Sequence, residues 1–218
     1  MDSARDPQLR DVYRRYLEDR NTQAFVAAVS RRYTQGTLQR LTESDSPEMR
    51  RAAVLALGLI GDYEANHSLG RALQDEDRSV RMMAETAIRN VWNRLGSEED
   101  RRMLAAVVRL NAAQHYEEAV RRASELLERA PWFAEVWNQR AIAQFSLGRY
   151  SESVHDCHQT LEINPYHFAA AAGMGQAYLE QGNVVAALEG FRRALRLNPN
   201  LEAVRVQIAR LTRMIEDK

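Results

Sequence analysis

Apolar residues recur along the whole chain at the three- and four-residue spacing of amphipathic helices. Segments that alternate apolar and polar residues, as half-buried strands do, are missing from the sequence. Short polar segments interrupt the helical pattern, as at residues 44–48 and 75–78. This pattern predicts an all-α protein in which short turns join consecutive helices.

Three prolines reveal an internal repeat in the C-terminal half. Pro131, Pro165 and Pro199 follow one another at intervals of 34 residues. The same period aligns a second set of residues, which occupies the turn between two helices: Gln114, Gly148 and Gly182. Glycine ends a helix by adopting left-handed backbone angles, and proline cannot continue a helix. The repeat therefore predicts helix–turn–helix hairpins, with helices over 134–146 and 151–163 in the middle copy.

These residues resemble the tetratricopeptide repeat family. In 134–167 the family's positions hold Trp137, Gly148, Tyr150 and Pro165. In 168–201 they hold Gly175, Tyr178, Gly182, Ala187, Phe191, Ala194 and Pro199. The copy at 100–133 departs from the family, because Val107 and Gln114 replace both glycines. Residues 202–216 predict an amphipathic helix that covers the last apolar face.

The N-terminal half repeats with a different period of 31 residues, which aligns Arg50 with Arg81 and Ala53 with Ala84. The strings 49–53 and 80–84 resemble the HEAT-repeat signature of an apolar residue, an arginine, two variable residues and an alanine. The resemblance covers 36–95, and 8–35 is interpreted as a degenerate first hairpin. It implies that Arg50 and Arg81 pack against acidic residues of neighbouring turns, for which Asp45 and Glu76 or Asp77 are the candidates.

Two domains follow from these repeats: a HEAT-like region at 1–96 and a tetratricopeptide domain at 97–218 with repeats at 100–133, 134–167 and 168–201. Between them, Ser97 and Asp100 have the spacing of a capping box that opens the next helix. The junction lacks the glycine, serine and proline of a flexible linker. We therefore expect one continuous α-solenoid.

Composition narrows the range of functions. The 30 basic residues balance 30 acidic ones, which argues against binding driven by nucleic-acid phosphates. The single cysteine, Cys157, suits a reducing compartment, and the polar start Met1–Asp6 lacks the apolar core of a signal peptide. No apolar run reaches the roughly 18 residues of a membrane span. We expect a cytoplasmic protein, and the preference for arginine over lysine suggests a bacterium with a GC-rich genome.

The nearest approach to a metal site is His155, Asp156, Cys157 and His158. The two histidines are spaced i and i+3 and share a helix face, but Cys157 should point away from them. We interpret this segment as an ordinary solvated helix face. The sequence contains no nucleotide-binding, metalloprotease or nucleophile-elbow motif. Catalytic residues, metals and cofactors are therefore not predicted.

The tetratricopeptide resemblance implies a partner instead: a peptide or helical segment of another protein, bound in a concave groove lined by the first helix of each hairpin. The groove positions are Asn138, Gln139, Ile142, Phe145, Ala169, Ala172, Gly173, Gln176 and Leu179, with Arg210 and Arg213 on the last helix. A subset of the family grips chaperone tails with a carboxylate clamp of Lys, Asn and Arg. Here the clamp positions hold Leu104, Val108, Gln139, Ala169 and Gly173. We expect no such chaperone partner.

An enzymatic alternative remains, because HEAT-like folds include phycobilin lyases and base-repair glycosylases. Such chemistry would need an acidic or thiol group together with an aromatic ligand pocket. Residues 36–95 contain no cysteine, and their only aromatic residues are Tyr63 and Trp92. A non-catalytic adaptor is therefore the preferred interpretation.

Overall fold

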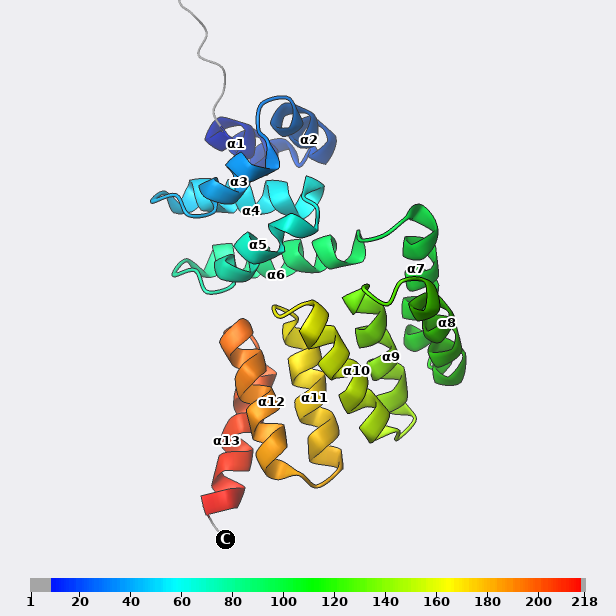
Figure 1. Ribbon diagram of the computed structural model, residues 1–218. Coiled ribbons are helices and arrows are strands. Elements are labelled where there is room, and N and C mark those ends of the chain that lie inside the picture. The colour runs from blue at the N-terminus through cyan, green and yellow to red at the C-terminus, as the bar shows by residue number, and fades with distance from the viewer. Residues whose placement is uncertain (1–8, 217–218) are drawn as a thin grey trace, which may run out of the picture. The chain divides into compact units, whose positions relative to one another are not determined.

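The computed structural model describes residues 9–216, and within them every regular element is helical (Figure 1). The predicted all-α class is confirmed, and the polar start Met1–Asp6 lies outside the described residues. Among these helices, none combines the length and the apolar character that would cross a membrane. The chain forms two compact units, Met1–Val91 and Trp92–Lys218. The units divide inside a helix, whereas the repeats had predicted the limit after residue 96.

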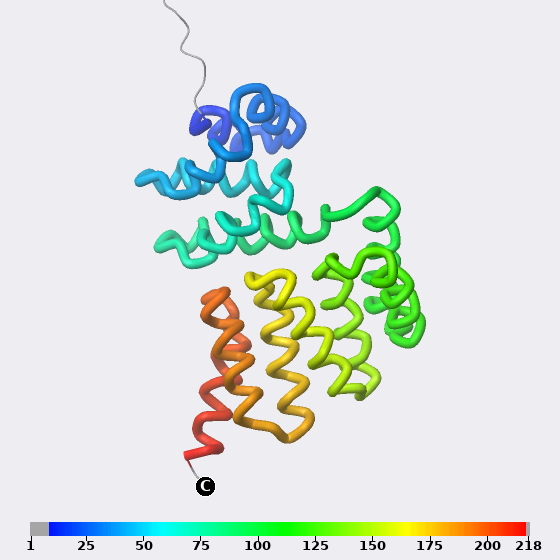
Figure 2. The backbone as a smooth tube through the Cα atoms, viewed as in Figure 1, coloured from blue at the N-terminus to red at the C-terminus, as the bar shows by residue number. Residues whose placement is uncertain are grey.

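Unit 1 consists of three helical hairpins in chain order (Figure 2). Their helices are α1 (Leu9–Asp19), α2 (Thr22–Ser30), α3 (Gln35–Leu41), α4 (Pro47–Ile60), α5 (Asn66–Ala72) and α6 (Arg78–Asn93), with a short 3₁₀ turn at Tyr63–Ala65. Polar side chains start α2 and α3, since Asn21 and Thr34 accept hydrogen bonds from the backbone of Ala24 and Thr37. Leu57, Leu69 and Ile88 are fully buried in the core of this unit.

Arg50 packs against an acidic turn of the next hairpin, where it meets the predicted Glu76 and also Asp75, which was not predicted. Its guanidinium donates two parallel hydrogen bonds to the carboxylate of Asp75, at 2.7 and 2.9 Å, and a third to Glu76 at 3.1 Å. Asp45 contributes only its backbone carbonyl, as does Ser44. The side chains of Arg50 and Asp75 are 8% and 9% exposed. The forked geometry of a guanidinium matches the Asp75 carboxylate, which lies in the turn between α5 and α6, so the pair joins consecutive hairpins.

The second signature arginine repeats the backbone contacts of the first. Arg81 donates to the backbone carbonyls of Asp75 and Glu76, at 2.8 and 3.0 Å. Asp77 starts α6 by accepting from the Val80 N–H at 3.0 Å, and its carboxylate pairs with Arg51. The hydrogen bond from Arg51 lowers the pKa of Asp77 to about 2, so this carboxylate stays charged at every ordinary pH.

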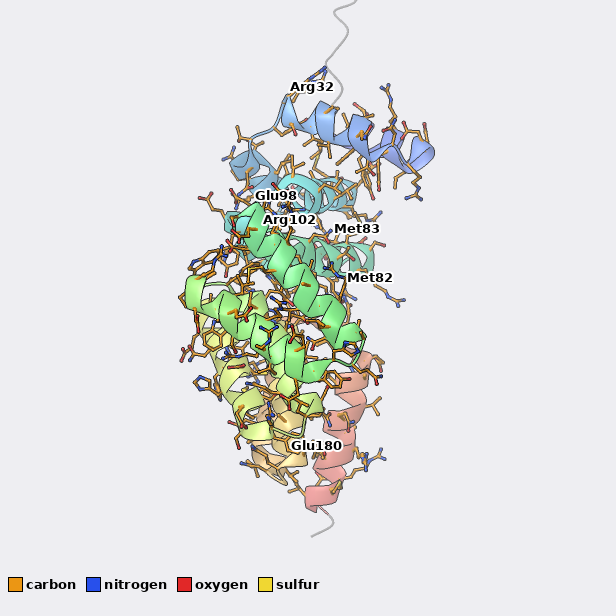
Figure 3. All side chains as sticks on the ribbon, turned by 90° about the vertical axis from the view of Figure 1, so that its right-hand side faces the viewer. Arg32, Met82, Met83, Glu98, Arg102 and Glu180 are labelled. Carbon is orange, nitrogen blue, oxygen red and sulfur yellow. The ribbon has the colours of Figure 1, made fainter. Side chains whose placement is uncertain are left out.

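One face of α6 carries two consecutive methionines, which Figure 3 labels. Met82 is 55% exposed, whereas the sulfur of Met83 accepts a contact of 3.9 Å from the Tyr13 hydroxyl. Together with residues of α4 they border a mainly apolar hollow that includes Leu55 and Leu59. This side of unit 1 therefore presents apolar surface to its surroundings.

The described part of unit 2 contains seven helices, of which the first six pair as antiparallel hairpins and the last packs against α12 (Figure 1). They are α7 (Glu98–Ala112), α8 (Tyr116–Arg129), α9 (Ala134–Ser146), α10 (Tyr150–Ile163), α11 (Phe168–Glu180), α12 (Val184–Leu197) and α13 (Glu202–Glu216). The predicted helices at 134–146 and 202–216 are confirmed, and the one predicted at 151–163 begins one residue earlier.

The predicted capping box is present at the start of α7. The Asp100 N–H donates to the Ser97 hydroxyl at 3.1 Å, and the Ser97 N–H donates to the Asp100 carboxylate at 3.0 Å. Glu98 and Arg102, labelled in Figure 3, pair one turn apart on the exposed side of the same helix. These contacts satisfy backbone donors that the first turn of a helix leaves free.

The turn positions of the three C-terminal repeats share one backbone conformation. Gln114, Gly148 and Gly182 have φ angles of 62°, 75° and 75°. A side chain in this left-handed region costs about 1 kcal/mol, a cost that glycine avoids. The repeat at 100–133 therefore has the same turn conformation as the other two repeats, although it lacks their glycine.

Replacing Gln114 with glycine should therefore stabilise unit 2 by about 1 kcal/mol, because the strained residue is relieved. Urea unfolding followed by circular dichroism measures the change. Gly148→Gln, which recreates the strain one repeat later, should lower stability by a similar amount. Equal stability of the wild type and both variants would show that these turns carry no strain.

Candidate functional site

The predicted groove of unit 2 contains a hollow of about 170 Å³ between α9, α10 and α11. Six of the predicted groove residues line it: Asn138, Ile142, Phe145, Ala169, Gly173 and Gln176. The helical period explains why they converge, since Asn138, Ile142 and Phe145 recur at intervals of four and three residues on one face of α9. Ala169, Gly173 and Gln176 repeat that spacing on α11.

The hollow exists because α11 offers little side chain there. A Cβ atom built at Gly173 would have one neighbour within 4 Å, the Cys157 sulfur at 3.6 Å. Opposite, Ile142 is 42% exposed, although it is a large apolar residue. The combination leaves an apolar recess that an incoming aliphatic or aromatic side chain could fill.

Below this recess lies a buried polar cluster centred on Glu135. Its carboxylate accepts from the amides of Asn138 and Gln139 at 3.1 and 2.8 Å, and it lies 3.0 Å from Nε2 of His167. Nδ1 of His167 accepts from the Ala170 N–H at 3.1 Å, so the ring proton resides on Nε2 and is donated to Glu135.

Burial alone would raise the pKa of the Glu135 carboxyl, but the hydrogen bonds from His167, Gln139 and Asn138 hold that pKa below its ordinary value. Glu135 is therefore ionised at neutral pH, and its two oxygens fix the side chains of α9 against the start of α11. The cluster orients Asn138, whose side chain borders the recess.

Five predicted groove residues do not line the hollow: Gln139, Ala172, Leu179, Arg210 and Arg213. The Gln139 side chain bonds to Glu135 and accepts from the Asn111 amide at 2.9 Å. Ala172 and Leu179 pack partly against the core cluster of α9 to α13. Arg210 and Arg213 are exposed on α13.

Four further residues line the hollow that the sequence did not assign to it: Ala141, Ser146, Ser153 and Cys157. Ser153 and Cys157 belong to α10, the second helix of the hairpin, and Ser153 donates to the Ala141 carbonyl at 2.9 Å. Only the first helix of each hairpin had been assigned to the groove. The repeat period could have indicated these two residues. Small side chains on the second helix of a hairpin leave that helix accessible from the groove beside the first helix.

In the segment His155–His158 the two histidines are exposed on one helix face, as predicted, whereas Asp156 and Cys157 are buried. Asp156 is buried and binds the Arg140 guanidinium through both carboxylate oxygens, at 2.7 and 2.9 Å. Cys157 is buried, and burial raises the pKa of its thiol to about 12, which keeps it protonated. His158 contacts the Tyr178 hydroxyl at 3.3 Å. Among the described residues, His, Cys, Asp and Glu side chains form no group of three arranged to hold a metal ion.

Comparison with known families agrees with the repeats seen in the sequence. The model of the HEAT-repeat family matches residues 34–127, and models of the tetratricopeptide repeat match 134–167 and 168–201. The HEAT match extends through α7 and most of α8, a segment that the sequence analysis assigned to a degenerate tetratricopeptide copy.

Curated relatives are similar to parts of the chain. A TPR repeat-containing protein of Rhizobium etli is 29% identical over 126 residues, which is 58% of this chain and 61% of that protein. The Hsp70-Hsp90 organizing protein of Triticum aestivum is 28% identical over 45% of this chain, but only 17% of its own length is covered. The chain thus spans less than two thirds of these relatives.

Among solved structures, the first TPR of Spaghetti (RPAP3) bound to the HSP90 peptide SRMEEVD superposes on 56% of this chain and 97% of that chain. The TM-score is 0.53 and the identity is 18%. The first TPR domain of human RPAP3 gives a TM-score of 0.51 over 53% of this chain. At this identity the likeness shows the fold alone.

Proposed function

Because the chain contains HEAT repeats followed by tetratricopeptide repeats, we propose that it is a non-catalytic adaptor that binds a peptide or helical segment of another protein. The binding site in this proposal is the concave groove of unit 2. Repeat arrays of this kind expose extended surfaces that suit protein partners. The relatives named above point in the same direction, since one organises the chaperones Hsp70 and Hsp90 and one binds an HSP90 peptide.

The observation that carries the proposal is the recess between α9 and α11. It is mostly apolar, it is bordered by the exposed Ile142 side chain, and its floor is free of bulk at Gly173. Apolar anchors that enter pockets supply most of the energy of many protein interfaces. The partner segment should therefore present an aliphatic or aromatic anchor, with Asn138 and Gln176 available beside it for polar contacts.

The proposed partner is not an acidic chaperone tail of the kind gripped by a carboxylate clamp. The positions corresponding to that clamp hold Leu104, Val108, Gln139, Ala169 and Gly173. None of these side chains carries a positive charge that could pair with a terminal carboxylate. Leu104, moreover, is 2% exposed and belongs to the core.

The same proposal places the protein in the cytoplasm. The thiol of Cys157, the single cysteine of the sequence, is buried and protonated. A protein with such a thiol suits a reducing compartment.

Filling the recess tests the proposal. Gly173→Met should occupy the space between α9 and α11, whereas Gly173→Ala places only a Cβ at ordinary contact distance from Cys157. Affinity purification from the native host should recover a partner with the wild type and with Gly173→Ala, and lose it with Gly173→Met. Circular dichroism must show that both variants stay folded. If Gly173→Met recovers the same partners in equal amounts, the groove is not the binding site.

A further inference from the structure

A second cavity, of about 660 Å³, lies between α10, α11 and α12. Its lining includes His158 of α10, Met174 and Tyr178 of α11, and Arg193, Arg196 and Leu197 of α12. Consecutive residues of a helix point about 100° apart. Met174 and Tyr178 therefore face away from Ala169, Gly173 and Gln176, and α11 separates this cavity from the groove.

Two helices approach each other closely beside the cavity. A Cβ atom at Gly190 would lie 2.8 Å from both the Cα and the N atom of Gly175, so α11 and α12 touch backbone to backbone there. Met174, Ala186 and Leu197 add apolar surface to the lining of the cavity.

The polar groups of the cavity carry excess positive charge. Arg196 is paired with Glu189 at 3.2 Å, which balances one charge. Arg193 is half-buried, and among the described residues its guanidinium has neither an ion pair nor a hydrogen bond. Nearby, Nε2 of His158 and the Tyr178 hydroxyl lie 3.3 Å apart and share a hydrogen bond, which leaves one donor of the pair for a ligand. A guanidinium without a partner, beside a further donor and apolar surface, favours an anion on an apolar body.

We propose that this cavity binds a small organic acid: a carboxylate paired with Arg193 and contacted by His158 or Tyr178, with an apolar body against Met174 and Leu197. Its volume falls within the range of about 300–1,000 Å³ that small-molecule sites occupy. A guanidinium is the side chain best suited to a carboxylate, because it donates two parallel hydrogen bonds. The site is independent of the groove, so either proposal can fail alone.

Titration of the ¹⁵N-labelled chain with phenylbutyrate, followed by NMR, tests this site. Phenylbutyrate should bind with a dissociation constant on the order of 1 mM or below and shift the amides of His158, Tyr178 and Arg193. Phenylbutanol, which lacks the charge, and acetate, which lacks the apolar body, should each bind at least about tenfold more weakly.

The matched variants lie next to each other on α12. Arg193→Gln should weaken phenylbutyrate binding about tenfold, and Arg193→Lys should restore part of it, because the charge returns without the fork. Arg192 is exposed and does not line the cavity, so Arg192→Gln, with the same loss of charge, should leave binding within about twofold. Spectra away from α12 report whether each variant is folded. Equal weakening by Arg192→Gln and Arg193→Gln, equal binding of phenylbutanol, or the absence of saturable shifts would overturn the proposal.

Discussion

Replacing Asp156 with alanine should lower the free energy of unfolding of unit 2 by about 3 kcal/mol, the lower end of the range for breaking a buried ion pair. The Asp156 side chain is 1% exposed and that of Arg140 is 17% exposed. The substitution would leave the Arg140 guanidinium with the Ser124 hydroxyl at 2.9 Å and the Trp137 ring at 4.8 Å, and with no opposing charge. Urea unfolding at neutral pH measures the loss.

An exposed pair provides the control. Arg149 and Glu117 are 41% and 66% exposed, and solvent screens their attraction. Glu117→Ala should therefore change stability by less than about 1 kcal/mol. Comparable losses for Asp156→Ala and Glu117→Ala would mean that the buried position of the first pair has no energetic consequence. Because Arg140 belongs to α9, the helix that carries Asn138 and Ile142, the Asp156 variant should also loosen the groove.

Gly190→Ala should destabilise unit 2 by about 1–3 kcal/mol, the usual cost of overpacking a core. The added Cβ would lie 2.8 Å from backbone atoms of Gly175 and 3.3 Å from the Ala171 carbonyl oxygen, and backbone cannot move aside as a side chain can. The two helices would have to separate. Thermal unfolding measures the effect as a lower melting temperature.

Gly173→Ala is the matched control, because it makes the same change on the neighbouring helix with only Cys157 in contact range. Alanine is the better helix former by about 1 kcal/mol, so this variant should be more stable than the wild type. The two glycine substitutions thus have opposite expected signs. Stabilisation by both would refute the close contact between α11 and α12.

The helical hairpins could be predicted from the sequence because their ends carry local signals. The prolines, the turn glycines and the Ser97–Asp100 capping box each act within a few residues of the helix they end or begin. The repeat period also predicts the turn at Gln114, which has no glycine. Gln114 adopts the left-handed φ angle of the glycines at the same position of the other repeats.

Pairings between hairpins were harder to predict. Arg50 was expected to meet an acidic residue of a neighbouring turn, and Glu76 was among the candidates, but its main partner Asp75 was not. Asp75 is distant in the chain and lies beside Arg50 only when the hairpins stack. Gly190 escaped notice for a similar reason, since the need for glycine there arises from the crossing of α11 and α12. Both features depend on how two helices meet, which a repeat period does not specify.

The groove falls between these cases. Six predicted residues share the recess because the family's positions follow the helical period. Gln139 and Ala172 are engaged elsewhere, since a residue at the edge of a helix face can turn toward the core or toward a buried polar group.

Site-specific photo-crosslinking tests the adaptor hypothesis most directly. A diazirine-bearing amino acid at Ile142 would stand at the border of the recess, and the same residue at Val185 would stand on α12, where the native side chain is 76% exposed and lies outside the recess. With the purified partner, position 142 should crosslink to one defined segment that contains an apolar anchor, and position 185 should not. Crosslinking at 185 but not at 142 would contradict binding in the groove.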